Sequence, residues 1–410
     1  MRRVASENEL SKVSDVAKKT IRDIPLKGRK VLIRADFNVP LTDKGQISND
    51  HRIRATVPTL RVALDAGAAV IVMSHLGRPS GDAKKDGKLA TDCIAARLAD
   101  LLNRPVRKAD EVVSDNVRRV ARTLKPGEVF VLENLRFHPG EKDGDGQLAS
   151  ELAALADVYV NDAFGTCHND DASMVAVPKC FAPGHRVVGL LVERELEVLD
   201  GLLGKPKQPV VAILGGAKVS DKIKLVESLI SRVDRLLIGG AMAYTFMTAL
   251  GRGVGASKVE KDSLDGARRL AELAGSKLTL PTDHLVAELP NAAAKTQIVS
   301  GDFPDGRFGM DIGPATIAAY QSVIEQAGTV VWNGPVGKFE DEPFRRGTRA
   351  IAEAMARSKA VTVVGGGETA EAVEKFGLAA KMTHVSTGGG AFLAYLGGEQ
   401  FASLAAIDDR

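Results

Sequence analysis

The sequence predicts an α/β protein with two doubly wound domains, each built on a parallel β-sheet. Three observations lead to this prediction. The chain has 410 residues, which suits two domains of roughly 150–200 residues better than one core. Short apolar runs alternate with amphipathic, Ala- and Leu-rich stretches along the whole chain. The apolar runs are continuous rather than alternating, which is typical of strands buried on both faces.

In the first half of the chain, four apolar runs are predicted to be strands and amphipathic stretches between them to be helices. The predicted strands are KVLIR (30–34), AAVIVMS (68–74), EVFVLENL (128–135) and DVYVND (157–162). The predicted helices are TVPTLRVALDAG (56–67), ATDCIAARLADLL (90–102) and GQLASELAALA (146–156). This alternation of strand and helix predicts the first parallel sheet.

The second half repeats the pattern after a charged amphipathic stretch that ends in Gly, Lys and Pro. This stretch, residues 189–208, is interpreted as an interdomain helix and linker between domains at 1–188 and 209–391, with residues 1–20 as a short extension. The loop HPGEKDGDGQ (138–147) is a second candidate boundary, but it joins two strands of one predicted sheet and is interpreted as a surface loop. The predicted strands are PVVAIL (209–214), RLLI (235–238), TVVW (329–332), AVTVV (360–364) and THVS (383–386).

Composition excludes several classes of protein. The net charge is +3 and the basic residues are dispersed, so a nucleic-acid-binding surface is not expected. No apolar run approaches the ~18 residues of a membrane helix. The acidic residues near the N-terminus argue against a targeting peptide. Cys93, Cys167 and Cys180 form no CxxC motif and are expected to be free thiols in a reducing compartment, which predicts a cytoplasmic protein.

Charged and amide side chains follow the predicted strands of the first half. In an open parallel sheet ligands bind beyond the carboxyl ends of the strands, so these residues predict a site for a small anion with phosphate and carboxylate groups. The alternative is that each arginine merely caps a helix or pairs with an acid. Arg52 follows the capping signal SND (48–50). The other residues are Arg34, Asp36, Asn38, His75, Arg78, Asn134, Arg136, Asn161 and Asp162.

Glycines follow the predicted strands of the second half, at 215–216, 239–240, 365–367 and 388–390. Glycine lets backbone N–H groups approach phosphate, although it also serves tight packing between strand and helix. Lys218 and Lys222 would share one face if a helix begins there, and they could serve a polyphosphate or be ordinary solvated lysines. Glu368 could complement a helix dipole or hold Mg²⁺. These turns predict a nucleotide site outside the Walker, protein-kinase and GxGxxG classes, whose motifs are absent.

Nine motifs resemble those of the phosphoglycerate kinase family, in the same order. The resemblance implies two Rossmann-like domains that face each other across a hinged cleft, with residues 392–410 packing back on the first domain. It also implies reversible phosphoryl transfer between ATP and the carboxylate of 3-phospho-D-glycerate. The motifs are RADFNVP, SHLGRP, LENLRF, NDAFGT, ILGGAKVSDK, LPTDH, VWNGPVGKFE, GGGETA and STGGGA, which span residues 34 to 391.

The resemblance also implies a role for individual residues. Those expected to bind the substrate are Asp36, Phe37, Asn38, Arg52, His75, Leu76, Gly77, Arg78, Arg136 and Asn169. Those expected to bind the nucleotide are Lys218, Lys222, Gly239, Gly240, Gly309, Asn333, Pro335, Glu340, Gly365, Gly366, Gly367, Glu368 and Thr369, with Glu368 as the Mg²⁺ ligand. The residues expected to act in catalysis are Arg52, Lys218, Gly389 and Gly390.

The sequence departs from the family pattern at two places. After NDAFGT the family usually runs His-Arg-x-His, whereas Asn169 and Asp171 stand at the arginine and second histidine here. Arg186 is a nearby arginine that could substitute for the missing charge. Glu368 stands where the family usually has Asp. A catalytically silent nucleotide-binding protein and a kinase of another small phosphorylated acid are therefore alternatives to a monomeric phosphoglycerate kinase.

Overall fold

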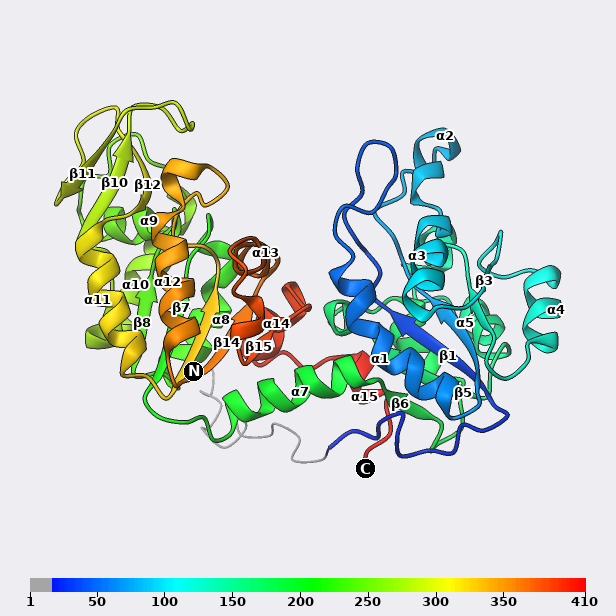
Figure 1. The fold of residues 1–410 in the computed structure, drawn as a ribbon. Coiled ribbons are helices and arrows are strands. Elements are labelled where there is room, and N and C mark those ends of the chain that lie inside the picture. The colour runs from blue at the N-terminus through cyan, green and yellow to red at the C-terminus, as the bar shows by residue number, and fades with distance from the viewer. Residues whose placement is uncertain (1–16) are drawn as a thin grey trace, which may run out of the picture. The chain divides into compact units, whose positions relative to one another are not determined.

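The computed structural model describes residues 17–410 and divides into two compact units (Figure 1). Unit 1 extends to Glu197 and also includes Gln400–Arg410, whereas unit 2 comprises Val198–Glu399. Within these described residues each unit contains a six-stranded parallel sheet, so the predicted fold class is confirmed. The predicted N-terminal extension lies outside the described residues up to position 16.

The sheet of unit 1 has the strand order β3-β4-β2-β1-β5-β6. Its four predicted strands are confirmed, and β3 and β6 are additional edge strands of three residues each, which are too short to give a clear pattern. The central strands β1, β2 and β5 are almost entirely buried, which explains their continuous apolar sequence. The bounds are β1 Lys30–Ala35, β2 Ala69–Met73, β3 Val106–Lys108, β4 Val129–Val131, β5 Val158–Asp162 and β6 Arg186–Val188.

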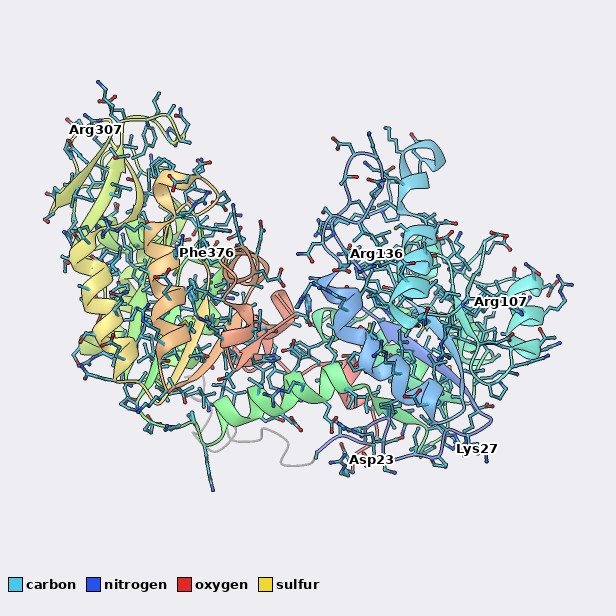
Figure 2. All side chains as sticks on the ribbon, viewed as in Figure 1. Asp23, Lys27, Arg107, Arg136, Arg307 and Phe376 are labelled. Carbon is cyan, nitrogen blue, oxygen red and sulfur yellow. The ribbon has the colours of Figure 1, made fainter. Side chains whose placement is uncertain are left out.

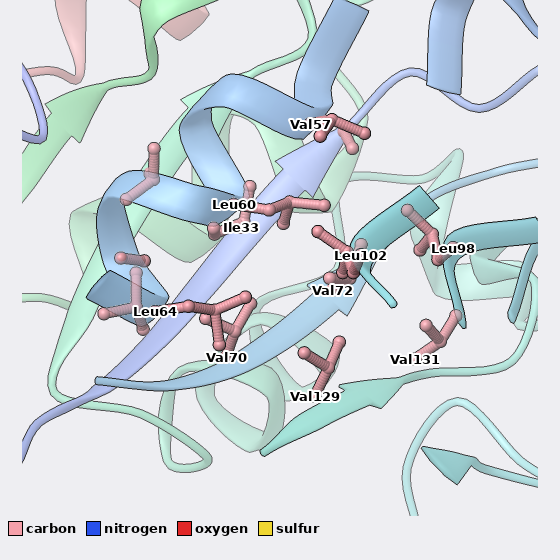
Figure 3. Close-up of a cluster of buried hydrophobic side chains, with 14 of the residues drawn as sticks. Ile33, Val57, Leu60, Leu64, Val70, Val72, Leu98, Leu102, Val129 and Val131 are labelled. Atoms are coloured by element: carbon pink, nitrogen blue, oxygen red, sulfur yellow. The ribbon is translucent and has the colours of Figure 1, made fainter. Parts of the chain in front are cut away.

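Helices α1 and α3 bury their apolar faces against the sheet of unit 1 (Figure 3). Leu60 and Leu64 of α1 and Leu98 of α3 belong to the same cluster as Ile33 and Val72 of the strands. Burying side chains of this size contributes about 1.5–3 kcal/mol each. The helices of this unit are α1 His51–Asp65, α2 Ala83–Asp86, α3 Asp92–Leu102, α4 Asp115–Thr123, α5 Gly146–Ala153, α6 Val177–Lys179 and α15 Ala402–Ala405.

Residues of unit 1 that are far apart in the sequence are joined by ion pairs near the C-terminus. Arg186 donates through Nε to Asp408 Oδ1 at 3.0 Å, and Lys18 pairs with Asp409 at 2.7 Å. Arg410 Nη2 lies 2.8 Å from Asp23 Oδ2, and Asp23 is labelled in Figure 2. These contacts fasten the last residues of the chain to the edge of the unit 1 sheet at β6.

The sheet of unit 2 has the strand order β15-β14-β13-β7-β8-β9. The five strands predicted in this half are confirmed to within a residue or two, and β9 is an additional edge strand. Helix α7, Leu190–Leu203, precedes β7 and crosses the boundary between the units. The strand bounds are β7 Val210–Leu214, β8 Arg235–Ile238, β9 Leu278–Thr279, β13 Thr329–Asn333, β14 Val361–Gly365 and β15 His384–Val385.

Unit 2 also carries an antiparallel sheet, β11-β10-β12, that was not predicted. Its outer strand β11 is largely exposed, so its sequence TQIVS lacks the continuous apolar pattern of the parallel strands. Its three strands are β10 Asp283–Ala287, β11 Thr296–Ser300 and β12 Phe308–Ile312.

The core of unit 2 surrounds Trp332, the single tryptophan of the chain, which is fully buried on β13. Ile317 of α11, Ile351 of α12 and Val373 of α13 belong to the same cluster. In the part of the chain that the structure describes, no helix combines the length and apolarity needed to span a membrane. The helices are α8 Ile223–Ile230, α9 Met242–Ala249, α10 Leu264–Ala274, α11 Pro314–Glu325, α12 Arg346–Arg357, α13 Gly367–Lys375 and α14 Gly390–Leu396.

Candidate functional site

In each six-stranded sheet, successive strands are added first on one side of the first strand and then on its other side. We call the place where the side changes the reversal point. In unit 1, β1 pairs with β2 on one side and with β5 on the other. In unit 2, β7 pairs with β8 on one side and with β13 on the other. Ligands of doubly wound folds bind beyond the strand ends at such points. The predicted substrate residues follow β1 and the strands β2, β4 and β5 of the same sheet, and most predicted nucleotide residues follow β7, β8, β13 and β14.

The end of β1 presents Asp36 and Asn38 beside Arg52. Arg52 donates through Nη1 to Asp36 Oδ2 at 2.7 Å, and Asn38 Oδ1 accepts the Gly77 N–H at 2.8 Å. Phe37 is fully buried and its N–H donates to Ser74 Oγ, so its side chain supports the turn rather than facing a ligand. The predicted acid, amide and arginine are therefore brought together.

Helix α1 orients Arg52 from its second residue. The helix begins at His51, directly after the SND signal and five residues before the predicted stretch 56–67, and Asn49 Oδ1 accepts the His51 N–H at 2.8 Å. Asp50 makes no side-chain cap and instead binds Arg97 at 2.7 Å. The capping signal therefore placed the helix start correctly, although a different residue of the signal binds the backbone.

Arg34 does not lie at the open edge, in contrast to the interpretation that every basic group there faces a ligand. It is fully buried and donates to Ser173 Oγ at 2.8 Å and to His75 Nδ1 at 3.2 Å. Ser173 Oγ in turn donates to Glu141 Oε1 at 2.6 Å. Arg34 thus compensates a buried carboxylate and orients His75, because an unpaired buried charge would be costly.

His75 is neutral at physiological pH rather than one of the cations of the edge. Its pKa lies well below the usual value, because burial and the charges of Arg34 and Arg136 disfavour the imidazolium. His75 therefore contributes hydrogen bonding without charge. The sequence reveals the histidine but not this desolvation.

The SHLGRP and LENLRF segments are joined through Asn134. The buried amide of Asn134 accepts the Leu76 N–H at 3.1 Å and donates to the Leu76 carbonyl at 2.7 Å. Arg136 (labelled in Figure 2) donates through Nη1 to the Gly77 carbonyl at 2.7 Å. Arg78 is exposed next to this turn. Asn134 and Leu76 thus hold the turn that carries Gly77 and Arg78.

Asn161 and Asp162 serve the structure rather than the edge. Asp162 is fully buried and accepts the Leu191 N–H at 2.9 Å at the start of α7. Burial raises the pKa of Asp162 to about 7. Asn161 Oδ1 accepts the Ala163 N–H at 3.1 Å. The expectation that both residues face a ligand is wrong because each satisfies buried backbone groups.

Asn169 is half-buried and directs its amide toward an acid. Its Nδ2 lies 3.4 Å from Asp171 Oδ2, and Lys142 Nζ lies 2.6 Å from Asp171 Oδ1. Arg186, the suggested substitute for the missing arginine, is instead held by Asp408, 2.5 Å from its Nη2. Arg186 therefore has its charge committed to the C-terminal segment.

In unit 2 the loops after β7, β8 and β13 pack backbone against backbone. The Gly216 N–H donates to the Pro335 carbonyl at 2.8 Å, and the Gly240 N–H donates to the Val336 carbonyl at 2.9 Å. A Cβ atom on Gly240 would lie 2.6 Å from the Gly216 nitrogen. Gly239 is closed off in the same way, since a Cβ there would lie 2.6 Å from Val336. These glycines permit the loops to meet, which is the packing alternative of the sequence analysis.

Lys222 lies inside this junction. It is nearly buried, and its Nζ donates to the Asn333 carbonyl at 3.1 Å and to the Asn333 side-chain oxygen. Burial lowers its pKa to about 8, although Glu368 and Asp221 act in the opposite direction. The junction therefore holds an ammonium whose desolvation would be relieved by a bound anion.

Lys218 and Lys222 do not share a helix face. Lys218 is exposed in the turn, and α8 begins only at Ile223. Glu260, which was not predicted, accepts the N–H groups of Val219 at 2.8 Å and Ser220 at 3.0 Å. A lone glutamate 40 residues away gives no signal in the sequence for this role.

The GGGETA segment joins this junction at the start of α13. Thr369 Oγ1 accepts the Gly334 N–H at 2.7 Å, and Asn333 Nδ2 donates to the Gly365 carbonyl at 2.9 Å. Gly366 has a φ of +92°, and a Cβ on Gly367 would meet no atom within 4 Å. Of the glycines at 365–367, the last therefore leaves open space for a ligand.

Glu368 lies exposed in the first turn of α13. Among residues 17–410 there is no group of three or more His, Cys, Asp or Glu side chains that could hold a metal by itself. Mg²⁺ commonly binds through one or two carboxylates together with nucleotide phosphates. A single exposed carboxylate near a junction that holds a buried ammonium fits that mode.

Four further predicted nucleotide or catalytic positions lie in other segments of unit 2. Gly309 packs on the buried ring of Tyr244, since a Cβ there would lie 2.3 Å from the ring. Glu340 is exposed in the loop after β13. Gly389 has a φ of +45° with no atom within 4 Å of a Cβ, and it precedes Gly390, the first residue of α14. Their assignment to a ligand stays a prediction.

Comparisons with known proteins agree over almost the whole chain. A family model described as "Phosphoglycerate kinase" matches residues 21–399. The phosphoglycerate kinase of Rhodopirellula baltica is 50% identical over 397 residues, covering 96% of this chain and 100% of that protein. That of Aquifex aeolicus is 46% identical, covering 96% of this chain and 99% of that protein.

Solved structures give the same result. The structure of phosphoglycerate kinase from Coxiella burnetii has a TM-score of 0.83 and 38% sequence identity, covering 95% of this chain and 98% of that chain. The structure of phosphoglycerate kinase from Pyrococcus horikoshii has a TM-score of 0.84 and 30% identity, with the same coverage of both chains.

Proposed function

This chain belongs to the phosphoglycerate kinase family and is a kinase that phosphorylates a carboxylate, and we propose that unit 1 binds 3-phospho-D-glycerate while unit 2 binds ATP or ADP. The proposed reaction is ATP + 3-phospho-D-glycerate ⇌ ADP + 1,3-bisphosphoglycerate. The observation that carries this division is the different chemistry at the two reversal points. Side-chain cations and amides follow β1, whereas glycine turns surround a nearly buried lysine after β7 and β13.

In unit 1, Asp36 and Asn38 bind the hydroxyl and carboxyl groups of the acid, and Arg52 neutralises the carboxylate. The Arg52–Asp36 distance of 2.7 Å supports this role, because the pair is preorganised and 32% of the Arg52 side chain remains exposed. The substrate phosphate is bound by a group of residues around the SHLGRP turn. These are His75, Leu76, Gly77, Arg78, Arg136 and Asn169, with Phe37 supporting the site from the core.

In unit 2, Lys222 and the turn that follows β14 bind the nucleotide phosphates. Thr369 and Gly367 support this role because they lie at the start of α13, whose N-terminal end favours anions. Asn333 holds Lys222 in position through its side-chain oxygen. Gly239, Gly240 and Pro335 shape the junction, and Gly309 and Glu340 take part in binding the nucleoside.

Mg²⁺ would be held by Glu368 together with the nucleotide phosphates, and it would neutralise charge on the transferred group. The carboxylate that is phosphorylated is already ionised at pH 7, so no general base is required. This agrees with a candidate site in which no Ser-His or Cys-His pair is used. Lys218, Arg52 and the backbone at Gly389 and Gly390 then stabilise the charge of the moving phosphoryl group.

We also propose that the enzyme acts in the cytoplasm and as a monomer. Cys93, Cys167 and Cys180 are free thiols, which supports a reducing compartment. The monomer is supported by the completeness of each set of residues within one chain. Gel filtration with light scattering would contradict this part of the proposal if it gave a dimer at assay concentrations.

A coupled assay of ATP-dependent phosphorylation of 3-phosphoglycerate tests the proposal. We expect turnover that is lost when Mg²⁺ is chelated and is restored when Mg²⁺ is added. Turnover with another phosphorylated acid but not with 3-phosphoglycerate would contradict the substrate assignment. Binding of ADP without any turnover would contradict the catalytic roles of Lys218 and Arg52.

A further inference from the structure

Lys142 is a cation of unit 1 to which the reaction described above assigns no role. It follows the short turn Pro139–Glu141 in the loop between β4 and β5. Its Nζ lies 2.6 Å from Asp171 Oδ1, and the side chain of Asp171 is 1% exposed whereas that of Lys142 is 56% exposed. A nearly buried carboxylate therefore holds an ammonium that still faces the solvent.

Hydrogen bonds connect this loop to the predicted substrate residues. Glu141, which immediately precedes Lys142, is fully buried and accepts the Ser173 hydroxyl at 2.6 Å. Ser173 Oγ accepts from Arg34 Nε at 2.8 Å, and Arg34 Nη2 lies 3.2 Å from His75 Nδ1. All four residues in this series of hydrogen bonds are buried. The backbone at Lys142 therefore has little freedom to move relative to His75.

Lys142 is one of the cations whose charge acts on His75. Burial and the charges of Arg34, Arg136, Arg52 and Lys142 together hold the pKa of His75 well below its usual value. Arg34 is buried, and Arg52 is already assigned to the carboxylate of the substrate, so neither is left for the phosphate. Lys142 remains exposed.

Asn169 is neutral, whereas the family usually has an arginine at this position. Its amide lies 3.4 Å from the same carboxylate, that of Asp171, which holds Lys142. Lys142 and Asn169 thus contact the two oxygens of the same carboxylate, that of Asp171. A single ion pair uses one of the three N–H donors of an ammonium and leaves the others for a ligand.

We propose that Lys142, positioned by Asp171, binds the phosphate of 3-phosphoglycerate and so supplies the positive charge that Asn169 does not. The proposal rests on the proposed function of unit 1. Asp171 is a positioning residue: fixing the long lysine side chain in the free protein lowers the entropy lost on binding. The carboxylate also offsets part of the ammonium's charge, so the gain is smaller than that from an unpaired arginine.

The first test compares Lys142→Gln with two control variants in the full-length enzyme. We expect Lys142→Gln to raise the KM for 3-phosphoglycerate about tenfold, since it removes one charge-assisted hydrogen bond from a partly solvated site. The kcat and the KM for ATP should change less than twofold. Lys142→Arg should retain a KM near the wild-type value, and Lys125→Gln, which alters an exposed lysine of unit 1, should change neither constant.

The second test separates ligand binding from a merely structural ion pair. In the Lys142→Gln background, Asp171→Asn should lower the KM for 3-phosphoglycerate, because the remaining carboxylate repels the phosphate. A structural pair would instead lower the thermal stability of both single variants and leave the KM unchanged. The double variant carries no unpaired buried charge, so it keeps the test decisive if Lys142→Gln folds poorly.

Failure of this inference can be distinguished from failure of the proposed function. If the wild-type enzyme phosphorylates 3-phosphoglycerate and the KM of Lys142→Gln is unchanged, the role of Lys142 is wrong and the function stands. If the wild-type enzyme does not phosphorylate 3-phosphoglycerate, the proposed function is wrong, and the inference falls with it.

Discussion

The reversal points of the two sheets occupy equivalent places but are built from different groups. After β1, the groups are mostly side chains: Asp36 Oδ2 accepts from Arg52 Nη1, and Asn38 Oδ1 accepts the Gly77 N–H. After β7 and β13, the groups are mostly backbone, brought together by glycines that a Cβ atom would force apart. The first arrangement depends on individual charges, and the second depends on how closely loops pack.

This difference has a physical origin in desolvation. Unit 1 keeps Arg52 and Lys142 partly exposed, whereas unit 2 buries Lys222 and lowers its pKa to about 8. A small acid can be distinguished from similar acids by side chains at fixed positions. A polyphosphate presents many equivalent oxygens, which backbone N–H groups and one buried ammonium can serve. The predictions below test this contrast, from the largest expected effect to the smallest.

Substituting Lys218 should have the largest effect. Lys218 is exposed, so its removal leaves the junction packed and takes away a charge that acts mainly on the moving phosphoryl group. We expect Lys218→Ala to lower kcat by roughly 10²–10³-fold with a much smaller change in ADP affinity. Steady-state kinetics and calorimetry measure the two quantities. Lys224→Ala, at an exposed lysine of α8, is the control; a normal kcat with a raised KM in Lys218→Ala would show that Lys218 only binds.

Adding a Cβ to the unit 2 junction should destabilise that unit. Gly240 has a φ of +63° and a Cβ would lie 2.6 Å from the Gly216 nitrogen, so Gly240→Ala should cost about 3 kcal/mol. Gly377 has a φ of +70° with no atom within 4 Å of a Cβ, so Gly377→Ala should cost only about 1 kcal/mol of backbone strain. Urea unfolding followed by the fluorescence of Trp332 reports on unit 2. Equal losses in both variants would mean that close packing at Gly240 contributes nothing.

The affinity for ADP should fall with rising pH because of Lys222. Only the protonated ammonium attracts phosphate, and its pKa of about 8 in the free protein means that the amine is mostly neutral at pH 9. We expect affinity to fall by up to about tenfold between pH 7 and pH 9, as measured by calorimetry. Lys222→Met should bind ADP more weakly and without this pH dependence. The same pH dependence in Lys222→Met would assign the titration to another group.

The same shift affects stability with the opposite sign. The unfolded chain returns Lys222 to its ordinary pKa of 10.5, so it binds more protons than the folded chain between about pH 8 and 10.5. Taken alone, this group makes the free energy of unfolding rise over that interval, while the affinity for nucleotide falls. Glu368 and Asp221, which favour the ammonium, limit both effects.

Restoring an arginine at position 169 should have the smallest effect. Asn169→Arg adds a cation, but Asp171 lies 3.4 Å from the Asn169 amide and would pair with it. We expect the KM for 3-phosphoglycerate to fall by only about threefold, with the KM for ATP unchanged. Adding Asp171→His should release the arginine and lower the KM further. An unchanged KM in both variants would place position 169 outside the substrate site.

Strand positions could be predicted from the sequence because their signal is local. KVLIR and RLLI are apolar at consecutive positions, and burial between two helix layers requires that pattern. The antiparallel strands β10–β12 could not be predicted in the same way. They form a separate three-stranded sheet, and its strand β11 is largely exposed. The signal for a strand weakens when only one face needs to be apolar.

The sequence by itself determined the family, the strand ends and the residue types that meet there, because motifs such as GGAKVSDK and LENLRF are short and contiguous. Only the tertiary structure decided which of those groups stay at the strand ends and which turn inward to pair within the protein. Arg34 turns inward to Ser173, 139 positions away, and Arg186 binds Asp408, 222 positions away. Burial and through-space pairing set the charge of a side chain, and both depend on residues that the fold brings together from distant parts of the chain.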